Sequence, residues 1–328
     1  MNEPGNSPTV SYGPVTYAPA TPPPPDGLAW PHDFDAGYGA GLRTAVSLGG
    51  GGLFFVAWQV SYLSEMLSRG IDLSGAQRVV GTSAGSLVAS VLEAGNLTRL
   101  RKEVGVLARL PKLMAALAPA ADLHASQSRA LERFGLAADA EPDTIRAIGH
   151  AALAARTPGP AVMPRNLALI LASRGWPSAA LHVTCVDAYT GERCVITGNS
   201  RVPVTRAVAA SSAVPGLFAP QPILDRRCMD GGVSGTGLHL DVVAGADKVV
   251  VLGLTDGAGV TEGMMTNAPD SIARELDALA GSGSEVFFRR PEHMDPLTLM
   301  DPKAVPEALA MGRRQAGVDA AELRVFWA

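Results

Sequence analysis

The feature that most constrains the fold of this chain is a repeated order of apolar strand, glycine-rich turn and helix between residues 43 and 95. Residues 43–48 form a short apolar run that leads into four consecutive glycines, and apolar residues then recur at helical spacing over 56–67. A second strand pattern at 77–81 leads through a glycine-serine turn into another helical pattern, which ends near Gly95. Strands joined by helical crossovers predict a parallel sheet with both faces covered.

Length and composition limit the class of protein. A chain of 328 residues with 47% hydrophobic and 18% charged residues can bury the core of a large α/β domain. The net charge of -4 gives no electrostatic reason to expect a nucleic-acid partner. Because the sequence has no apolar run of the roughly 18 residues that a membrane span needs and no signal-peptide pattern at its start, we expect a cytoplasmic protein whose membrane contact, if any, is peripheral.

The chain divides by composition into an arm and a folded domain. Residues 1–40 are proline-rich and predict an extended or disordered arm, and residues 41–328 predict one α/β domain. Within the domain, residues 97–180 are rich in alanine and leucine and broken by prolines, which predicts a helical insertion. Its first part, 97–112, predicts a basic amphipathic helix, which can lie on an anionic membrane or pack its apolar face on the core.

Strand patterns return after the insertion. We expect strands at 181–187 and 192–197, a short strand that ends near Asp230, and another at 247–254. The last strong helical pattern covers 303–315.

The turn at the end of the second strand has the pattern G-x-S-x-G, with Gly81, Ser83 and Gly85 at the fixed positions. In a strand-to-helix elbow the serine sits on a sharp bend, and the two glycines let the helix approach the strand without a Cβ clash. The positive end of the following helix favours negative charge near the serine hydroxyl. Ser83 is therefore a candidate nucleophile, and the alternative is that it only caps the helix.

A nucleophilic serine needs a base and a set of hydrogen-bond donors for the oxyanion. The glycines at 49–52 can supply backbone N–H groups, although such a loop can also bind phosphate. Asp230 follows a strand in "MDGG" and is a candidate base at a strand's carboxyl end, or else part of an ordinary Asp-Gly turn. His182 and His239 are the alternative bases, in a triad with Ser83.

The cysteines are three in number, Cys185, Cys194 and Cys228, and they are widely spaced. An odd, dispersed set indicates neither a disulfide framework nor a metal cluster.

Five ordered segments give the chain a family resemblance. "GGGG", "GTSAG" and "DGG" occur in that order, together with "VDAYTGE" at 186–192 and "RAVAASSAVPGLFAPQPI" at 206–223. In these segments the chain resembles the patatin-like phospholipases, and the likeness runs from about residue 43 to 255.

The resemblance implies a three-layer α/β/α fold with a mainly parallel central sheet and a helical insertion. It implies a Ser-Asp dyad of Ser83 and Asp230, with an oxyanion hole among Gly50, Gly51 and Gly52, and no metal or cofactor. The implied activity is hydrolysis of lipid esters of phospholipase A, lysophospholipase or lipase type through an acyl-enzyme. The alternatives are an acyltransferase that uses the same nucleophile and a non-catalytic patatin-fold binding module.

Two departures from the family pattern stand out. In the family, a basic residue, arginine or lysine, usually comes after the glycines of the loop. In this chain the residues after the four glycines are Leu53, Phe54 and Phe55. The segment after Asp230 also lacks the usual Asn-x-Pro. The first departure leaves open which glycines donate to the oxyanion, and the second concerns the substrate pocket rather than the dyad.

Overall fold

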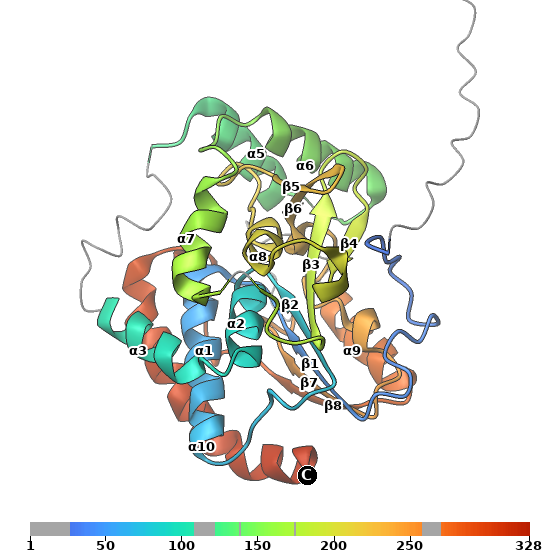
Figure 1. The fold of residues 1–328 in the computed structure, drawn as a ribbon, viewed down its shortest axis with the longest axis vertical. Coiled ribbons are helices and arrows are strands. Elements are labelled where there is room, and N and C mark those ends of the chain that lie inside the picture. Colours follow the sequence, from blue (N-terminus) through green and yellow to red (C-terminus); the bar gives the residue numbers. More distant parts are fainter. Residues whose placement is uncertain (1–26, 108–121, 138, 174, 258–269) are drawn as a thin grey trace, which may run out of the picture.

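The computed structural model describes residues 27–107, 122–137, 139–173, 175–257 and 270–328. Within these ranges one sheet of eight strands forms the centre, in the order β5-β6-β3-β2-β1-β7-β8, with β4 paired to β3 (Figure 1). The parallel strands are β3 (Leu181–Asp187), β2 (Arg78–Thr82), β1 (Thr44–Leu48), β7 (Lys248–Leu252) and β8 (Glu285–Arg289). β4 (Arg193–Ile196) and β6 (Arg226–Asp230) run antiparallel to β3, and β5 (Gln221–Ile223) runs antiparallel to β6.

The central strands bury side chains on both faces, which is why they form continuous apolar runs. In β1, Val46 and Leu48 lie in one apolar cluster, whereas Ala45 lies in a second. In β7, Val250 belongs to the first cluster and Val249 to the second. The alternation with period two therefore divides the interior into two cores, one on each side of the sheet.

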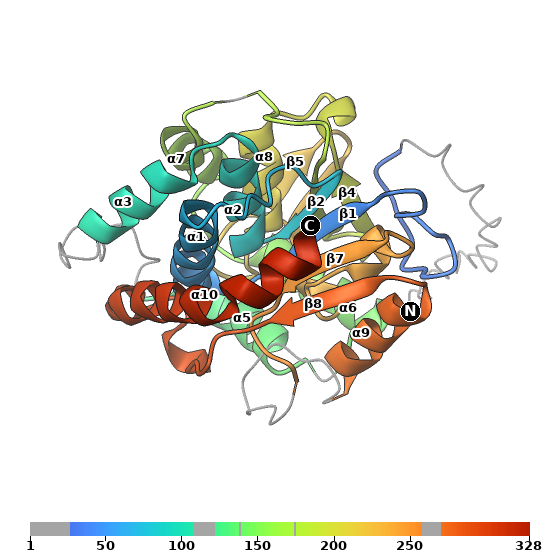
Figure 2. The same ribbon diagram turned by 90° about the horizontal axis from the view of Figure 1, so that it is seen from below.

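Helices cover both cores, and this arrangement confirms the three-layer α/β/α fold (Figures 1 and 2). The first core is covered by α1 (Gly52–Ser68), α2 (Ala84–Glu93), α8 (Val204–Ser211) and α10 (Val305–Trp327). The second is covered by α9 (Ser271–Gly281) and the 3-10 turn η3 (Leu240–Val243). A smaller third cluster joins α5 (Ala125–Gly135) and α6 (Pro142–Ala154) to Val186 and Met229.

The region predicted as a helical insertion is mainly helical where it is described. It contains α3 (Leu97–Leu107), α5, α6 and α7 (Val162–Leu171). In α3, Leu97 and Leu100 are buried, and Val104 and Leu107 pack against the first core, so its apolar face is turned inward. The end of the predicted amphipathic helix, 108–112, lies outside the described residues, and the boundaries of the insertion stay a prediction.

The described part of the predicted arm packs along β4 and η3. The N–H of Val195 donates to the oxygen of Leu28 at 2.8 Å, and Leu28 is buried. The buried Arg193 forms two 2.6 Å hydrogen bonds with the carboxylate of Asp241, and its Nε donates to the oxygen of Trp30. Residues 1–26 lie outside the described residues, and the arm boundary at 40 stays a prediction.

The last helix is longer than the sequence predicted. The pattern predicted a helix over 303–315, but α10 continues to Trp327. Ala316, Ala320 and Leu323 are buried in its second half, and two of these three are alanines that add little apolar periodicity to the sequence. Among the described helices, none combines the length and apolar composition that crossing a bilayer requires.

The crossing of α10 over α1 depends on Gly312. A Cβ at this position would lie 2.5 Å from the backbone oxygen of Trp58, whereas a Cβ at Gly317 would come no closer than 3.5 Å to a side-chain nitrogen of Arg69.

We expect Gly312→Ala to lower the free energy of unfolding by roughly 1–3 kcal/mol through overpacking. Gly317→Ala should raise it by up to about 1 kcal/mol through helix propensity. Urea unfolding of both variants tests this, and equal stabilisation would contradict the close packing at Gly312.

Candidate active site

Ser83 joins β2 to α2 in a strained conformation. Its φ of 51° lies in the left-handed region that non-glycine residues rarely adopt. A Cβ at Gly85 would lie 1.9 Å from the oxygen of Leu48, and one at Gly81 would lie 2.6 Å from the Cα of Ser86. Both glycines are therefore required, because the start of α2 lies directly against the ends of β1 and β2.

The hydroxyl of Ser83 does not cap the helix that follows. Ser83 occupies the N-cap position of α2, but its side chain accepts no capping hydrogen bond. The hydroxyl instead donates to Oδ2 of Asp230 at 2.8 Å. The half-buried Ser83 and the buried Asp230 thus form a hydrogen-bonded pair from positions 147 residues apart in the sequence.

Strand register along β3 explains how Asp230 reaches Ser83. Thr184 of β3 pairs with Thr82, the last residue of β2, and the next residue, Cys185, pairs with Asp230, the last residue of β6. Because β4 pairs with both Thr184 and Cys185, it occupies one edge of β3, and β2 and β6 must share the other edge. The two strands therefore meet end to end with their carboxyl ends facing each other, since β6 runs antiparallel.

The carboxylate of Asp230 is held at both oxygens. Its Oδ2 accepts from Ser83, and its Oδ1 accepts from the N–H of Gly232 at 2.8 Å. Gly231, between them, passes close to β3, because a Cβ there would lie 2.7 Å from Oγ1 of Thr184. The "DGG" sequence thus supplies both the carboxylate and the tight turn that orients it.

Burial changes the acidity of Asp230. Asp230 is 2% exposed, and this desolvation raises the pKa of its carboxyl to about 7, against the opposing effect of the hydrogen bonds from Gly232 and Ser83. An ordinary aspartate is a poor base for a serine hydroxyl because its pKa is ~3.9. Burial therefore makes Asp230 a stronger base while leaving a large share of it ionised near neutral pH.

Two further serines, which the sequence did not single out as site residues, fix the backbone of Ser83. The N–H of Ser83 donates to Oγ of Ser211 at 2.8 Å, and Oγ of Ser86 donates to the oxygen of Ser83 at 2.7 Å. Ser211 is fully buried at the end of α8. It lies within the 206–223 segment that resembles the family, but its partner becomes evident only from the placement of α8.

The glycine loop lies beside the serine. The N–H of Gly49 continues the sheet by donating to the oxygen of Leu252 at 3.0 Å. The N–H groups of Gly50, Gly51 and Gly52 have no acceptor within the described part of the chain. A Cβ at Gly50 would lie 3.1 Å from Cβ and 3.8 Å from Oγ of Ser83. The loop therefore brings backbone close to the serine hydroxyl without a side chain between them.

Within this loop Gly52 adopts a left-handed φ of 65°. A Cβ there would lie 2.7 Å from the oxygen of Leu299, which also accepts from the N–H of Phe54 at 3.0 Å. The chain segment before α10 thus holds the start of α1 in place.

The two histidines considered as bases bind elsewhere. Nδ1 of His182 lies 2.8 Å from the oxygen of Ala180, and burial lowers the pKa of His182 to about 4. Nε2 of His239 lies 3.0 Å from the oxygen of Gly231, and burial beside Arg193 holds its pKa well below the usual range. Both rings are therefore neutral near pH 7. His239 contacts the turn after Asp230 rather than the hydroxyl of Ser83.

The three cysteines, whose spacing indicated no cluster, lie together. The sulfur atoms of Cys185, Cys194 and Cys228 are all within 4.8 Å of one another, and all three residues are buried. None forms a disulfide. Their separation along the chain concealed this because β3, β4 and β6 become neighbours only through the sheet topology.

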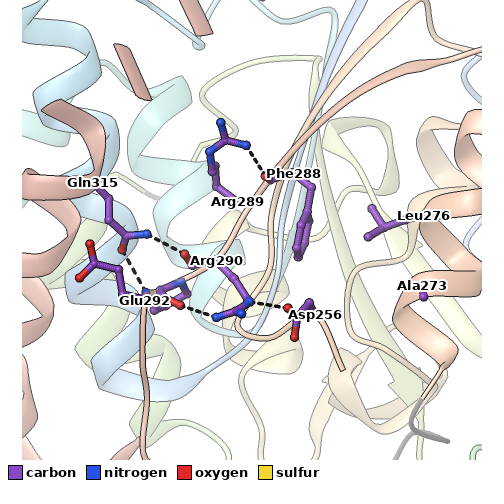
Figure 3. A pocket seen from close by; sticks show the side chains of 9 residues that line it. Asp256, Ala273, Leu276, Phe288, Arg289, Arg290, Glu292 and Gln315 are labelled. Carbon is purple, nitrogen blue, oxygen red and sulfur yellow. Dashed lines mark hydrogen bonds and ion pairs between the residues drawn. The ribbon is translucent and has the colours of Figure 1, made fainter. Parts of the chain in front are cut away.

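A cavity is lined by residues of β8, α9 and α10 and of the loops next to them, and neither Ser83 nor Asp230 lines it (Figure 3). Nε of Arg290 donates to Asp256 at 2.8 Å, and Nε2 of Gln315 donates to the oxygen of Arg290 at 2.9 Å. Oε1 of Gln315 also accepts from Trp58 of α1 at 2.8 Å. These contacts join β8 to α10 and α1, so the polar groups of this cavity have a structural role.

The raised pKa of Asp230 predicts a pH-dependent gain in stability when its charge is removed. The folded protein has a pKa near 7 at this carboxyl against 3.8 for an ordinary one, so burying the ionised form costs stability at high pH. We expect Asp230→Asn to raise the free energy of unfolding by on the order of a few kcal/mol at about pH 8, with a difference that vanishes as the pH falls to about 4. Urea unfolding at several pH values measures this; a pH-independent difference would contradict it.

Comparison with known proteins identifies the family of the chain. A family model described as patatin-like phospholipase matches residues 46–240. VipD from Legionella pneumophila is a similar solved structure, with 13% identity, coverage of 86% of this chain and 67% of VipD, and a TM-score of 0.40. The type III effector protein ExoU has 17% identity, coverage of 85% of this chain and 53% of its own, and a TM-score of 0.33. No curated protein matches the chain. Because the family model matches more than half of the chain, the chain belongs to the patatin-like phospholipase family.

Proposed function

We propose that this protein is a serine acyl hydrolase that cleaves carboxylic esters of lipids, of phospholipase A, lysophospholipase or lipase type. The observation that carries the proposal is the 2.8 Å hydrogen bond from the hydroxyl of Ser83 to the buried carboxylate of Asp230. The lipid substrate class is supported by the description of the family to which the chain belongs.

In the first half of the reaction, Oγ of Ser83 attacks the carbonyl carbon of the ester while its proton moves to Oδ2 of Asp230. The tetrahedral oxyanion accepts hydrogen bonds from the loop of Gly50, Gly51 and Gly52. Collapse of this intermediate breaks the ester bond, and the leaving alcohol takes the proton from Asp230. The acyl group is then bound to Ser83 as an ester.

In the second half, water attacks the acyl-enzyme. Asp230, ionised again, accepts a proton from this water as the new oxyanion forms in the same loop. Collapse releases the carboxylic acid and returns the proton to Oγ of Ser83. A carboxyl with a pKa near 7 suits both roles, because it can accept the proton in one step and return it in the next.

The nucleophile is tested with Ser83→Ala and a matched control, Ser90→Ala. Ser90 lies on α2, and its hydroxyl donates to the oxygen of Ser86 at 2.7 Å. We expect Ser83→Ala to lose labelling by a fluorophosphonate probe and to lower hydrolysis of a short-chain p-nitrophenyl ester by at least about 10³-fold. Ser90→Ala should keep both activities. Retained turnover in Ser83→Ala would exclude Ser83 as the nucleophile.

The base is tested with Asp230→Asn, which keeps an acceptor for the N–H of Gly232. We expect this variant to lower kcat roughly 10²–10⁴-fold, because the proton of Ser83 has no base to accept it. His182→Gln is the control that should leave kcat nearly unchanged. The reverse ranking, with a folded and active Asp230→Asn, would support a histidine base.

The oxyanion loop is tested with Gly50→Ala. The added methyl group would lie 3.1 Å from Cβ of Ser83 and would occupy the space beside the hydroxyl. We expect kcat to fall about 10²–10³-fold with a smaller change in KM, because the loss concerns the transition state. Gly75→Ala, where a Cβ meets no atom within 4 Å, is the control and should behave as wild type. Full activity of Gly50→Ala would exclude an oxyanion site next to Gly50.

A further inference from the structure

The three buried cysteines are brought together by strand register. Cys185 of β3 pairs directly with Cys194 of β4 across one edge. On the other edge, Cys185 pairs with Asp230 and Asp187 pairs with Cys228, so Cys228 is the diagonal neighbour of Cys185 on the same face of the sheet. All three side chains therefore point into the first core, and their sulfur atoms converge within 4.8 Å of one another.

The three thiols lie in a mainly apolar part of the core, with the buried carboxylate of Asp187 beside Cys228. Cys185, Cys194 and Cys228 are 0% exposed, and they belong to the same buried cluster as Ile196 and Ile223. Hydrogen bonding among the thiols, with burial, holds the pKa of Cys185 well above its usual value. The cluster is thus a set of neutral thiols, with soft ligand atoms on three sides of one point.

We propose that Cys185, Cys194 and Cys228 form a trigonal binding site for a trivalent thiophilic ion of the arsenite or antimonite class. The reaction balances without any oxidant: three S–H bonds and three bonds from the trivalent atom to hydroxide break, three bonds to sulfur form, and three waters leave. The product carries no net charge. The site can therefore be filled without burying an unpaired charge in the core.

Charge and ligand number disfavour the other soft ions. Zinc in proteins normally takes four ligands, whereas the group has three members among the described residues. Three thiolates around a divalent ion would also leave one negative charge in the apolar cluster, and around a monovalent copper ion they would leave two. A trivalent ion satisfies both the ligand number and the charge.

Occupation of this site would act on the proposed catalytic carboxylate. Cys228 lies two residues before Asp230 on β6, and Cys185 is the direct strand partner of Asp230. Three bonds from one atom to Cys185, Cys194 and Cys228 would cross-link β3, β4 and β6 beside Asp230 and so restrain the position of its carboxylate. The binding site is independent of the proposed function, but its inhibitory effect rests on that function.

Binding is tested with the reduced full-length protein and sodium arsenite. Native mass spectrometry should show one adduct whose mass gain equals one arsenic atom less three protons, accompanied by a sulfur-to-arsenic absorption band in the near ultraviolet. This mass reports three As–S bonds in the wild-type protein, so the test does not depend on any variant folding. An adduct that retains hydroxyl groups, or no adduct, would overturn the proposal.

Variants and a competing ion sharpen the result. Cys194→Ala should weaken arsenite binding roughly 10²–10⁴-fold, because a two-sulfur site loses most of the chelate advantage. Circular dichroism shows whether this variant is folded, and undiminished arsenite binding in the folded variant would overturn the trigonal site. Zinc should not displace arsenite from the wild-type protein; displacement by equimolar zinc would overturn the charge argument.

The effect on the active site is measured separately. Stoichiometric arsenite should abolish most p-nitrophenyl ester hydrolysis by wild type but not by Cys194→Ala. Full hydrolysis by the arsenic-loaded wild type would overturn the link between the two sites while leaving the adduct in place. If the wild-type protein hydrolyses no ester at all, the proposed function fails, and the mass measurement still decides the thiol site.

Discussion

The end-to-end meeting of β2 and β6 along one edge of β3 is the constraint on which the candidate site depends. Consecutive residues of β3, Thr184 and Cys185, pair with the last residues of the two strands, Thr82 and Asp230. Ser83 follows directly, so its hydroxyl meets the carboxylate of Asp230 without any flexible connection. A shift of one residue in the register between β3 and β6 would move Asp230 to the other face of the sheet and separate the pair.

The glycines of the GTSAG and DGG motifs permit this meeting. At Gly85, Gly81 and Gly231 an added Cβ would lie 1.9, 2.6 and 2.7 Å from the nearest neighbouring atom. Each distance is shorter than Cβ atoms normally show, so a larger residue at these positions would force neighbouring atoms to shift. The glycines therefore mark positions where two backbone segments pack closely. Ser83 is held at a positive φ between Gly81 and Gly85. Such strain persists because the surrounding sheet and α2 leave no other path for the chain.

Much of this could be predicted from local sequence. The apolar strands, the elbow at Ser83 and the turn at Asp230 each have a short-range signal, and their order pointed to the fold. Contacts between segments that only the fold brings together had no short-range signal in the sequence. The contact of Ser211 and the cysteine cluster depend on which strands and helices become neighbours. The sequence predicted a strand that ends near Asp230, but not that this strand, β6, runs antiparallel to β3. The second half of α10 was not predicted, because its buried face consists largely of alanine.

The choice of an aspartate rather than a histidine as the candidate base follows from how the polar groups are distributed. His239 is hydrogen-bonded to the oxygen of Gly231 and His182 to that of Ala180, and burial keeps both rings neutral.

Asp230 is the buried group that faces the serine, with hydrogen bonds from Ser83 and Gly232 and, among the contacts described, no cationic partner. An arginine beside it would lower its pKa and weaken it as a base. Arg193 is paired with Asp241, and His239 lies between that ion pair and the backbone of Gly231. The Arg193–Asp241 ion pair is thus separated from the turn after Asp230 by His239, which favours the basicity that the proposed proton transfer from Ser83 would require.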